Sequence, residues 1–471
     1  MTSGTRVLLL NPPSPERLGA PLLGQQYVAS ALLAAGCEVR VIDAAARHFS
    51  GDEDTILAAI EEFAPDVVGV GLFTRWVWHA YRLVARLVGT GPLLIAGGAH
   101  TTVRPEETLR QGFDVAVVGE AEHTVARLIA AHSAGEPLHH IPGLVLPTPA
   151  GPHRTPSAGF IVDLDGLAFP QSAQHLFDPA WYDPTGRTSV PGGLLTSRGC
   201  PARCTFCANY VTGRGFRYRS ADNVATELQA HHDAFGTRFF PFWDDALTAH
   251  RKRLLALCER LSQIEFQPRW SAITRASMVT PDLLRAMKAA GLVHVNLGVE
   301  SGDDEILRVI KKGVTTDEVE AALRMAKDEG LKTAANFMLG FPQETPANLG
   351  RTLGFMERIA PLVDTFSTLG VAVPFPGTPL YEDHHERFGF TDWWLQERYS
   401  HYDEAPPLSD REAFSRYYRD DANLQLDFFG YDDATRQAIR ECLVFKAEHN
   451  LAKMGLLEDP VFAPDPVARS A

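Results

Sequence analysis

Three cysteines in one short loop are the residues whose types and spacing indicate chemistry most directly. Cys200, Cys204 and Cys207 form the pattern C-x3-C-x2-C. Three thiolates this close in sequence can bind three irons of a [4Fe–4S] cluster, whose fourth iron then lacks the protein ligand found in four-cysteine electron-transfer sites. An iron with an open position can bind a small molecule and act on it. The loop therefore predicts an open iron–sulfur cluster.

A structural zinc site is the alternative interpretation of these cysteines. Zinc needs a fourth cysteine or histidine at a matching spacing, usually as part of a second pair. No histidine falls inside the loop, and Cys258, Cys37 and Cys442 lie in separate apolar segments. Those three residues are expected to be buried core thiols, so the pattern favours the cluster over zinc.

Length and composition indicate a large enzyme of a reducing compartment. A chain of 471 residues suggests two or three domains, and 45% hydrophobic residues are enough for a full core. The net charge of −14 argues against binding to nucleic acid or anionic membranes. A clustered cysteine trio, with no signal peptide and no apolar run of membrane-spanning length, favours a cytoplasmic location.

The first 135 residues alternate strand and helix patterns. Short buried-type strands with helices between them predict an α/β domain built on a doubly wound, Rossmann-like parallel sheet, on which ligands bind beyond the carboxyl ends of the strands. No G-x-G-x-x-G motif follows the first strand, which argues against a dinucleotide site. The expected strands are Arg6–Asn11, Val39–Asp43, Asp66–Phe73, Leu93–Gly97 and Asp114–Gly119.

A second α/β domain is expected over residues 193–380, after a proline-rich linker at 136–192. Six strand–helix repeats predict a partial (β/α)6 barrel with its site at the strand carboxyl ends. Residues 381–471 are expected to form a helical, aromatic-rich C-terminal region that caps a substrate pocket or packs in the core. The expected strands are Gly193–Ser197, Arg238–Trp243, Arg269–Ile273, Val293–Val299, Thr333–Leu339 and Thr365–Val373.

Two sets of motifs resemble one enzyme family. The cysteine loop, with Phe206 before its last cysteine, resembles the signature of the radical S-adenosylmethionine (SAM) enzymes. The motifs Asn-Pro-Pro, Pro-Leu-Leu-Gly, Gly-Gly-Ala-His and Val-Gly-Glu-Ala-Glu, in this order along the first 135 residues, resemble the cobalamin-binding domain of the B12-dependent members. The D-x-H-x-x-G pattern is absent, so the resemblance implies cobalamin without a protein histidine on cobalt.

The resemblance assigns cofactor contacts to residues at the strand ends. Thr74, Arg75 and Trp76 are placed near the lower face of the corrin, although ordinary helix packing is the alternative for Trp76. The cobalamin residues implied are Asn11, Pro12, Gly24, Thr74, Arg75, Trp76, Gly97, Gly98, His100, Gly119 and Glu120. The SAM residues implied are Asp244, Asp245, Arg275, Glu300, Ser301 and Gly340; for each acid, a helix N-cap or a solvated face is the alternative.

The same resemblance implies the reaction. The reduced cluster cleaves SAM, the 5′-deoxyadenosyl radical abstracts hydrogen from an unactivated carbon of a small molecule, and methylcobalamin donates a methyl group, as in natural-product biosynthesis. The alternatives are a rearrangement, cyclisation or ring contraction without methyl transfer, methylation at phosphorus or an sp² carbon, and a non-catalytic cobalamin-binding sensor. An electron donor such as flavodoxin or ferredoxin is the expected partner, with no nucleic acid and no membrane.

Overall fold

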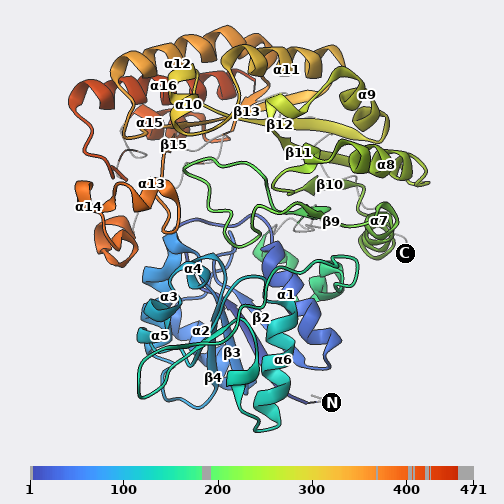
Figure 1. Ribbon diagram of the computed structural model, residues 1–471, viewed down its shortest axis with the longest axis vertical. Coiled ribbons are helices and arrows are strands. Elements are labelled where there is room, and N and C mark those ends of the chain that lie inside the picture. Colours follow the sequence, from blue (N-terminus) through green and yellow to red (C-terminus); the bar gives the residue numbers. More distant parts are fainter. Residues whose placement is uncertain are drawn as a thin grey trace. The chain divides into compact units, whose positions relative to one another are not determined.

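The computed structural model describes residues 4–182, 193–367, 370–400, 406, 409–419, 424 and 426–453 (Figure 1). The chain divides into two compact units. The N-terminal unit takes in Met1–Gly192, Ala208–Gly213 and Asp392–His401; the barrel unit takes in Gly193–Cys207, Arg214–Thr391 and Tyr402–Ala471. A short C-terminal segment is therefore part of the N-terminal unit.

The N-terminal unit is built on a sheet with the strand order β2-β1-β3-β4-β5-β6-β7, of which β1 to β5 are parallel. The parallel strands are β1 Arg6–Asn11, β2 Glu38–Asp43, β3 Val67–Gly71, β4 Leu93–Gly97 and β5 Val115–Val117. Helices connect them (Figure 1): α1 Leu23–Ala34, α2 Glu53–Phe63, α3 Val77–Ala85, α4 Ala99–Val103, α5 Pro105–Arg110 and α6 Glu122–Ser133. The doubly wound sheet is confirmed.

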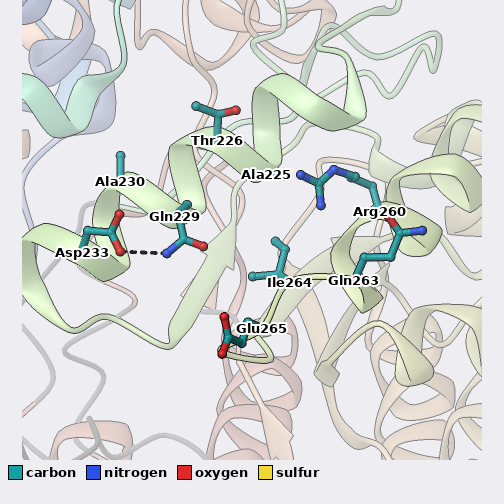
Figure 2. Close-up of a pocket in the computed structure, with 9 residues that line it drawn as sticks. All are labelled: Ala225, Thr226, Gln229, Ala230, Asp233, Arg260, Gln263, Ile264 and Glu265. Carbon is teal, nitrogen blue, oxygen red and sulfur yellow. Dashed lines mark hydrogen bonds between the residues drawn. The ribbon is translucent and has the colours of Figure 1, made fainter.

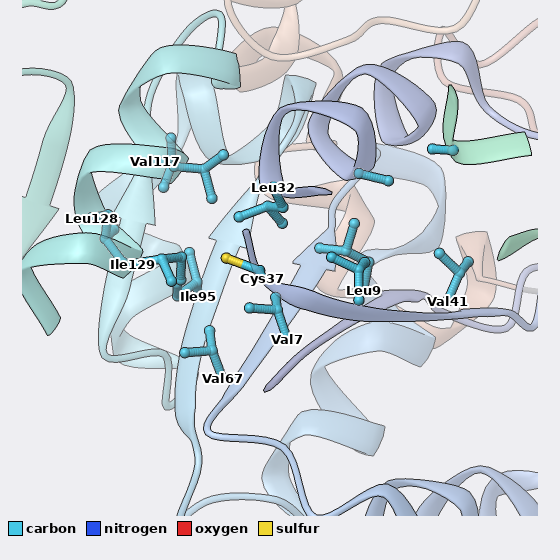
Figure 3. Close-up of a cluster of buried hydrophobic side chains, with 14 of the residues drawn as sticks. Val7, Leu9, Leu32, Cys37, Val41, Val67, Ile95, Val117, Leu128 and Ile129 are labelled. Atoms are coloured by element: carbon cyan, nitrogen blue, oxygen red, sulfur yellow. The ribbon is translucent and has the colours of Figure 1, made fainter. Parts of the chain in front are cut away.

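Apolar runs explain why these segments form parallel strands. Strands covered by helices on both faces need hydrophobic side chains on both faces, so they show continuous runs instead of alternation. Val7 and Leu9 of β1 pack with Leu32 of α1 and Ile129 of α6 on one face (Figure 3). Leu8 and Leu10, on the opposite face of β1, are buried as well.

Part of the expected linker belongs to this sheet. β6 Leu144–Leu146 pairs antiparallel with β5, and β7 His153–Arg154 pairs antiparallel with β6. Leu144 and Val145 are buried, so the short apolar run in the proline-rich stretch is recruited to the sheet edge. The sheet therefore has two more strands than the sequence predicts.

The barrel unit has a second parallel sheet in the order β10-β11-β12-β13-β14, with β15 also paired to β13. Its strands are β10 Phe239–Phe242, β11 Arg269–Thr274, β12 Leu292–Glu300, β13 Lys332–Leu339, β14 Thr365–Phe366 and β15 Gly370–Val371. Each strand of the central series is followed by a helix (Figure 1): α7 Ala221–Phe235 precedes β10, then come α8 Arg251–Ser262, α9 Pro281–Ala289, α10 Asp304–Val309, α11 Thr316–Asp328 and α12 Pro346–Ile359.

The expected first barrel strand is shorter than predicted. Leu194 forms a single parallel bridge with Phe242 of β10. The next residues instead form β8 Ser197–Arg198, which pairs antiparallel with β9 Arg217–Tyr218. This change of partner directs the chain from the barrel sheet into the cysteine loop.

Helices dominate the described C-terminal region: α13 Pro379–Glu382, α14 His385–Phe388, α15 Arg411–Arg419 and α16 Asp433–Ala452. Within the described residues, no helix is long and apolar enough to cross a membrane.

Candidate cofactor sites

Two carboxylates at the end of β10 hold the start of the cysteine loop. Asp244, which is buried, accepts hydrogen bonds from the backbone and hydroxyl of Thr196 and from the hydroxyl of Ser197. The exposed Asp245 accepts a hydrogen bond from the Gly199 backbone nitrogen at 3.1 Å. Both Asp244 oxygens accept hydrogen bonds inside the barrel unit, and its contact with SAM stays a prediction. The contact of Asp245 with SAM also stays a prediction.

The cysteine trio lies beside a positively charged side chain. Among the residues that the structure describes, no three Cys, His, Asp or Glu side chains converge as on one metal ion. Arg275 donates to the Cys204 sulfur at 3.4 Å. Burial raises the pKa of Cys200, and the positive charge of Arg275 opposes this rise. A guanidinium beside three thiols favours their binding as thiolates.

The far side of the loop is anchored to the other strand ends of the barrel unit. The backbone nitrogen of Thr205 donates to the carbonyl of Ile310, and the carbonyl of Thr205 accepts from Leu380. The Phe206 ring packs against Phe341 with ring centroids 5.8 Å apart. Phe341, in the motif after β13, therefore lies beside the cysteine loop.

Glu300 ends β12 in an unusual backbone conformation. Its φ is +75°, and the pairing of β12 with β13 shifts register between Gly298 and Glu300. Lys312 donates to Glu300 Oε1 at 2.6 Å, with side-chain exposures of 7% and 10%. The Lys312 ammonium also lies 5.9 Å from the Phe206 ring centroid. Strained backbone of this kind persists where the surroundings fix a functional side chain.

Ser301 and Gly340, two further residues of the predicted SAM set, make hydrogen bonds inside the barrel unit. The fully buried hydroxyl of Ser301 contacts the Thr352 hydroxyl at 3.2 Å and accepts from the Asp303 backbone. Gly340 donates its backbone N–H to Glu344 and accepts the Tyr431 hydroxyl at its carbonyl. These groups connect strand ends with α12 and the C-terminal region, and their contacts with SAM stay predictions.

In the N-terminal unit, the predicted cobalamin residues gather at the carboxyl ends of β1, β3, β4 and β5. A 2-1-3-4-5 sheet changes direction between β1 and β3, and such switch points bind ligands. Asn11 ends β1 and Thr74 follows β3. A Cβ added to Gly97 or Gly119 would meet no heavy atom within 4 Å. This bare backbone fits a large flat cofactor.

Asn11 supports the same interpretation. Its side-chain nitrogen Nδ2 donates to Asp43 at 2.7 Å, while its buried side-chain oxygen Oδ1 has no hydrogen-bond partner among the described residues. Since a buried polar atom without a partner is costly, a ligand group at this edge is a natural partner for it.

Other residues of the cobalamin set have different roles. Trp76 is buried and donates to Glu16, and Arg75 pairs with the same carboxylate. These contacts agree with a packing role for Trp76, and its contact with cobalamin stays a prediction. The Glu120 carboxylate accepts from the Ile161 backbone at 2.7 Å and so holds the following segment. His100 is fully buried and bonded inside the unit. Direct contact of His100 with cobalamin stays a prediction.

Pro12 is buried, whereas Gly24 is exposed on α1 with open space around its Cβ position. Gly98 has φ +99°, and an added Cβ would lie 2.8 Å from the Leu72 carbonyl oxygen. Gly98 is therefore needed for the close approach of two backbone segments at the strand ends.

Sequence reasoning missed two residues at these sites. Lys312 lies on a loop after α10, and only its ion pair with Glu300 reveals its place. Phe73, two residues beyond the end of β3, is 36% exposed, while its neighbour Trp76 is buried. The position of Phe73 after a strand at the switch point is the sequence signal that would have identified it.

The pocket in Figure 2 lies elsewhere, between α7 and α8, with a volume of about 450 Å³. Among its lining residues, the Gln229 side chain donates to the Asp233 carboxylate at 2.7 Å. It contains none of the predicted cofactor residues and is not the candidate site. Its lining consists of Ala225, Thr226, Gln229, Ala230, Asp233, Arg260, Gln263, Ile264 and Glu265.

Comparisons with known proteins agree with these sites. The model of the Radical SAM superfamily matches residues 194–356, and that of the B12 binding domain matches residues 20–129. An uncharacterized methyltransferase of Pyrococcus horikoshii is 31% identical over 80% of this chain and 82% of its own. An anaerobic magnesium-protoporphyrin IX monomethyl ester cyclase of Cereibacter sphaeroides is 28% identical over 83% of this chain and 63% of its own.

The fold has a counterpart among solved structures. The radical SAM methyltransferase TsrM from Kitasatospora setae, solved with cobalamin and a [4Fe–4S] cluster bound, is 21% identical with a TM-score of 0.64, covering 82% of this chain and 75% of that one. Together with the cysteine loop and the strand-end sites, these matches show that the chain belongs to the B12-dependent radical SAM enzymes, whose cofactors are a [4Fe–4S] cluster, SAM and cobalamin.

Proposed function

We propose that this enzyme transfers a methyl group to an unactivated carbon of a small molecule. The observation that carries the proposal is the presence of two candidate sites in one chain. One is the three-cysteine loop near Glu300 and Lys312. The other is the strand-end edge of the B12 binding domain, where Gly97 and Gly119 leave open space beside the backbone. When bound, the cluster and SAM supply a 5′-deoxyadenosyl radical, and cobalamin supplies the methyl group.

The barrel residues have distinct roles in this proposal. Cys200, Cys204 and Cys207 hold three irons, and the fourth iron is left for SAM. Lys312 supplies a positive charge for the SAM carboxylate, and Glu300 accepts hydrogen bonds from its ribose or amino group. This replaces the prediction that Arg275 pairs with that carboxylate, because Arg275 is directed at the Cys204 sulfur.

The N-terminal residues orient and shield cobalamin. Gly97 and Gly119 let the backbone approach the corrin, and Asn11 offers its carbonyl oxygen. Phe73, which is exposed two residues beyond β3, would shield bound cobalamin from water. A one-electron donor such as flavodoxin or ferredoxin reduces the cluster. The substrate is a small molecule, and a natural-product pathway is one setting.

Cyclisation without methyl transfer is a second candidate, favoured by the likeness to the Cereibacter sphaeroides cyclase. Two products separate the candidates. Methyl transfer consumes a second SAM as methyl donor and yields S-adenosylhomocysteine, whereas cyclisation yields 5′-deoxyadenosine alone.

The experiment is an anaerobic assay of the reconstituted full chain with cobalamin, SAM and a chemical reductant, with both nucleoside products quantified. Formation of S-adenosylhomocysteine only when cobalamin is present supports methyl transfer. 5′-Deoxyadenosine without S-adenosylhomocysteine favours cyclisation, and absence of both products contradicts an active enzyme. Cys204→Ala is the matched control and should form no 5′-deoxyadenosine.

A further inference from the structure

A buried carboxylate in the N-terminal unit joins residues far apart in the sequence. Glu107 on α5 accepts from the Tyr81 hydroxyl at 3.0 Å and lies 3.1 Å from His100 Nε2. The Trp394 indole N–H donates to both oxygens of Glu107, at 3.1 and 3.0 Å. All four side chains are buried. Three donors thus surround one carboxylate.

Trp394 reaches this site from the C-terminal segment that belongs to the N-terminal unit. It is 2% exposed and lies in the turn η8 Trp393–Leu395. Its ring packs against His100 with centroids 5.4 Å apart, and the Arg104 guanidinium lies 5.5 Å from its centroid. A second link is made by His79, whose Nε2 lies 3.1 Å from the Ser400 carbonyl oxygen. The segment is therefore fixed at both ends.

The network continues from the carboxylate to the cobalamin edge. Burial opposes ionisation of Glu107, but hydrogen bonds from His100, Trp394 and Tyr81 hold its pKa below the ordinary value. Burial lowers the pKa of His100. A neutral His100 facing a carboxylate carries its proton on Nε2, so Nδ1, 3.1 Å from Thr74 Oγ1, accepts the Thr74 hydroxyl proton.

Thr74 is the first residue of the turn η1 Thr74–Trp76, which follows β3 at the switch point. A rotamer held by a buried hydrogen-bond network is fixed more firmly than one held by packing alone. The contacts Trp394–Glu107, Glu107–His100 and His100–Thr74 therefore connect the C-terminal segment to the turn that follows β3.

We propose that Trp394 is a positioning residue for cobalamin binding, which it supports through Glu107 and His100 by fixing the Thr74 turn. The inference rests on the proposed cobalamin role of the N-terminal unit. It assigns to the 392–400 segment a part in the B12 site that the family domain, matched at residues 20–129, does not contain.

The test compares wild type with Trp394→Phe, which keeps an aromatic ring and removes the indole donor. Hydroxocobalamin is titrated into the full chain, and the cob(II)alamin EPR spectrum is recorded after reduction. We expect Kd to rise about tenfold, the effect of one lost hydrogen bond to a charged group, and the cobalt hyperfine pattern to change. Trp270→Phe is the matched control, because Trp270 is an equally buried tryptophan whose N–H donates to Ala290 in the barrel unit.

Thr74→Val keeps the test decisive if Trp394→Phe does not fold, since it leaves Glu107 with all its donors and breaks only the last link. It should weaken cobalamin binding to a similar extent. Unchanged Kd and EPR spectra in the variants, or equal changes in Trp270→Phe, would overturn the positioning role while leaving the proposed function intact. A wild-type chain that binds no hydroxocobalamin would refute both.

Discussion

The buried ion pair of Lys312 and Glu300 leads to a quantitative prediction. Lys312→Met preserves much of the aliphatic volume and removes the ammonium. The Glu300 carboxylate, which is 10% exposed, then lacks the ammonium group that lies 2.6 Å away in the wild type. Breaking a buried pair by removing one partner costs about 3–5 kcal/mol; with slight exposure of Glu300 we expect about 3 kcal/mol in the unfolding of the barrel unit.

The assay is a double-mutant cycle in urea, followed by circular dichroism on the full chain without cofactors. Glu300→Gln combined with Lys312→Met removes both charges and should recover about 2 kcal/mol of the loss. Arg324→Met provides the matched control. Its partner Glu320 lies at 3.0 Å in the helical i,i+4 arrangement with Arg324 59% exposed, so the cost should stay below about 0.5 kcal/mol.

A coupling of less than about 0.5 kcal/mol between Glu300 and Lys312 would refute the reasoning. The Lys312–Glu300 pair would then contribute no more to stability than the exposed Arg324–Glu320 pair, and its burial beside the cysteine loop would have no electrostatic effect. A strong coupling together with an unchanged SAM affinity of Lys312→Met would instead show that the pair stabilises the fold and does not bind SAM.

Further changes have expected results of their own. Cys204→Ala should lose bound iron and keep cobalamin binding, as measured by iron assay and cobalamin absorbance. Gly98→Ala should destabilise the N-terminal unit by about 1–3 kcal/mol, because φ is +99° and the new Cβ would lie 2.8 Å from the Leu72 oxygen; Gly97→Ala, with open space around it, should keep its stability in urea and weaken cobalamin binding. Burial raises the pKa of Glu344 to about 8, so its contribution to stability is full below the unfolded value of 4.5 and is lost as pH rises through about 8. Glu344→Gln, which resembles the protonated acid, should show a smaller fall in urea midpoint between about pH 6 and pH 9 than wild type.

The sheets could be predicted from the sequence because their determinants are local. Continuous apolar runs such as Arg6–Asn11 identify strands covered on both faces, and the order of strand and helix patterns leads to a parallel sheet. Short elements could not be predicted in this way. β7 His153–Arg154 has two residues, too few for any period, and its pairing is decided by the neighbouring strand.

The candidate sites divide in the same manner. The spacing of the cysteines is a local property, so the cluster loop is visible in the sequence. The hydrogen-bond partners of a side chain, in contrast, depend on residues far away in the sequence. Asp244 and Ser301 both lie in the predicted motifs, yet Asp244 accepts a hydrogen bond from Thr196 and the Ser301 hydroxyl contacts that of Thr352. Lys312 could not be assigned either, because its role depends on a partner across a helix and loop.

The central claim is that one chain holds both an open cluster and cobalamin, and the stoichiometry of bound metals tests it most directly. The full chain is reconstituted anaerobically with iron, sulfide and hydroxocobalamin, freed of excess reagents, and analysed for iron and cobalt. The account predicts about four iron and about one cobalt per chain, one cube and one corrin. Iron without cobalt would contradict the B12 site, and cobalt with no more than about one iron per chain would contradict the open cluster.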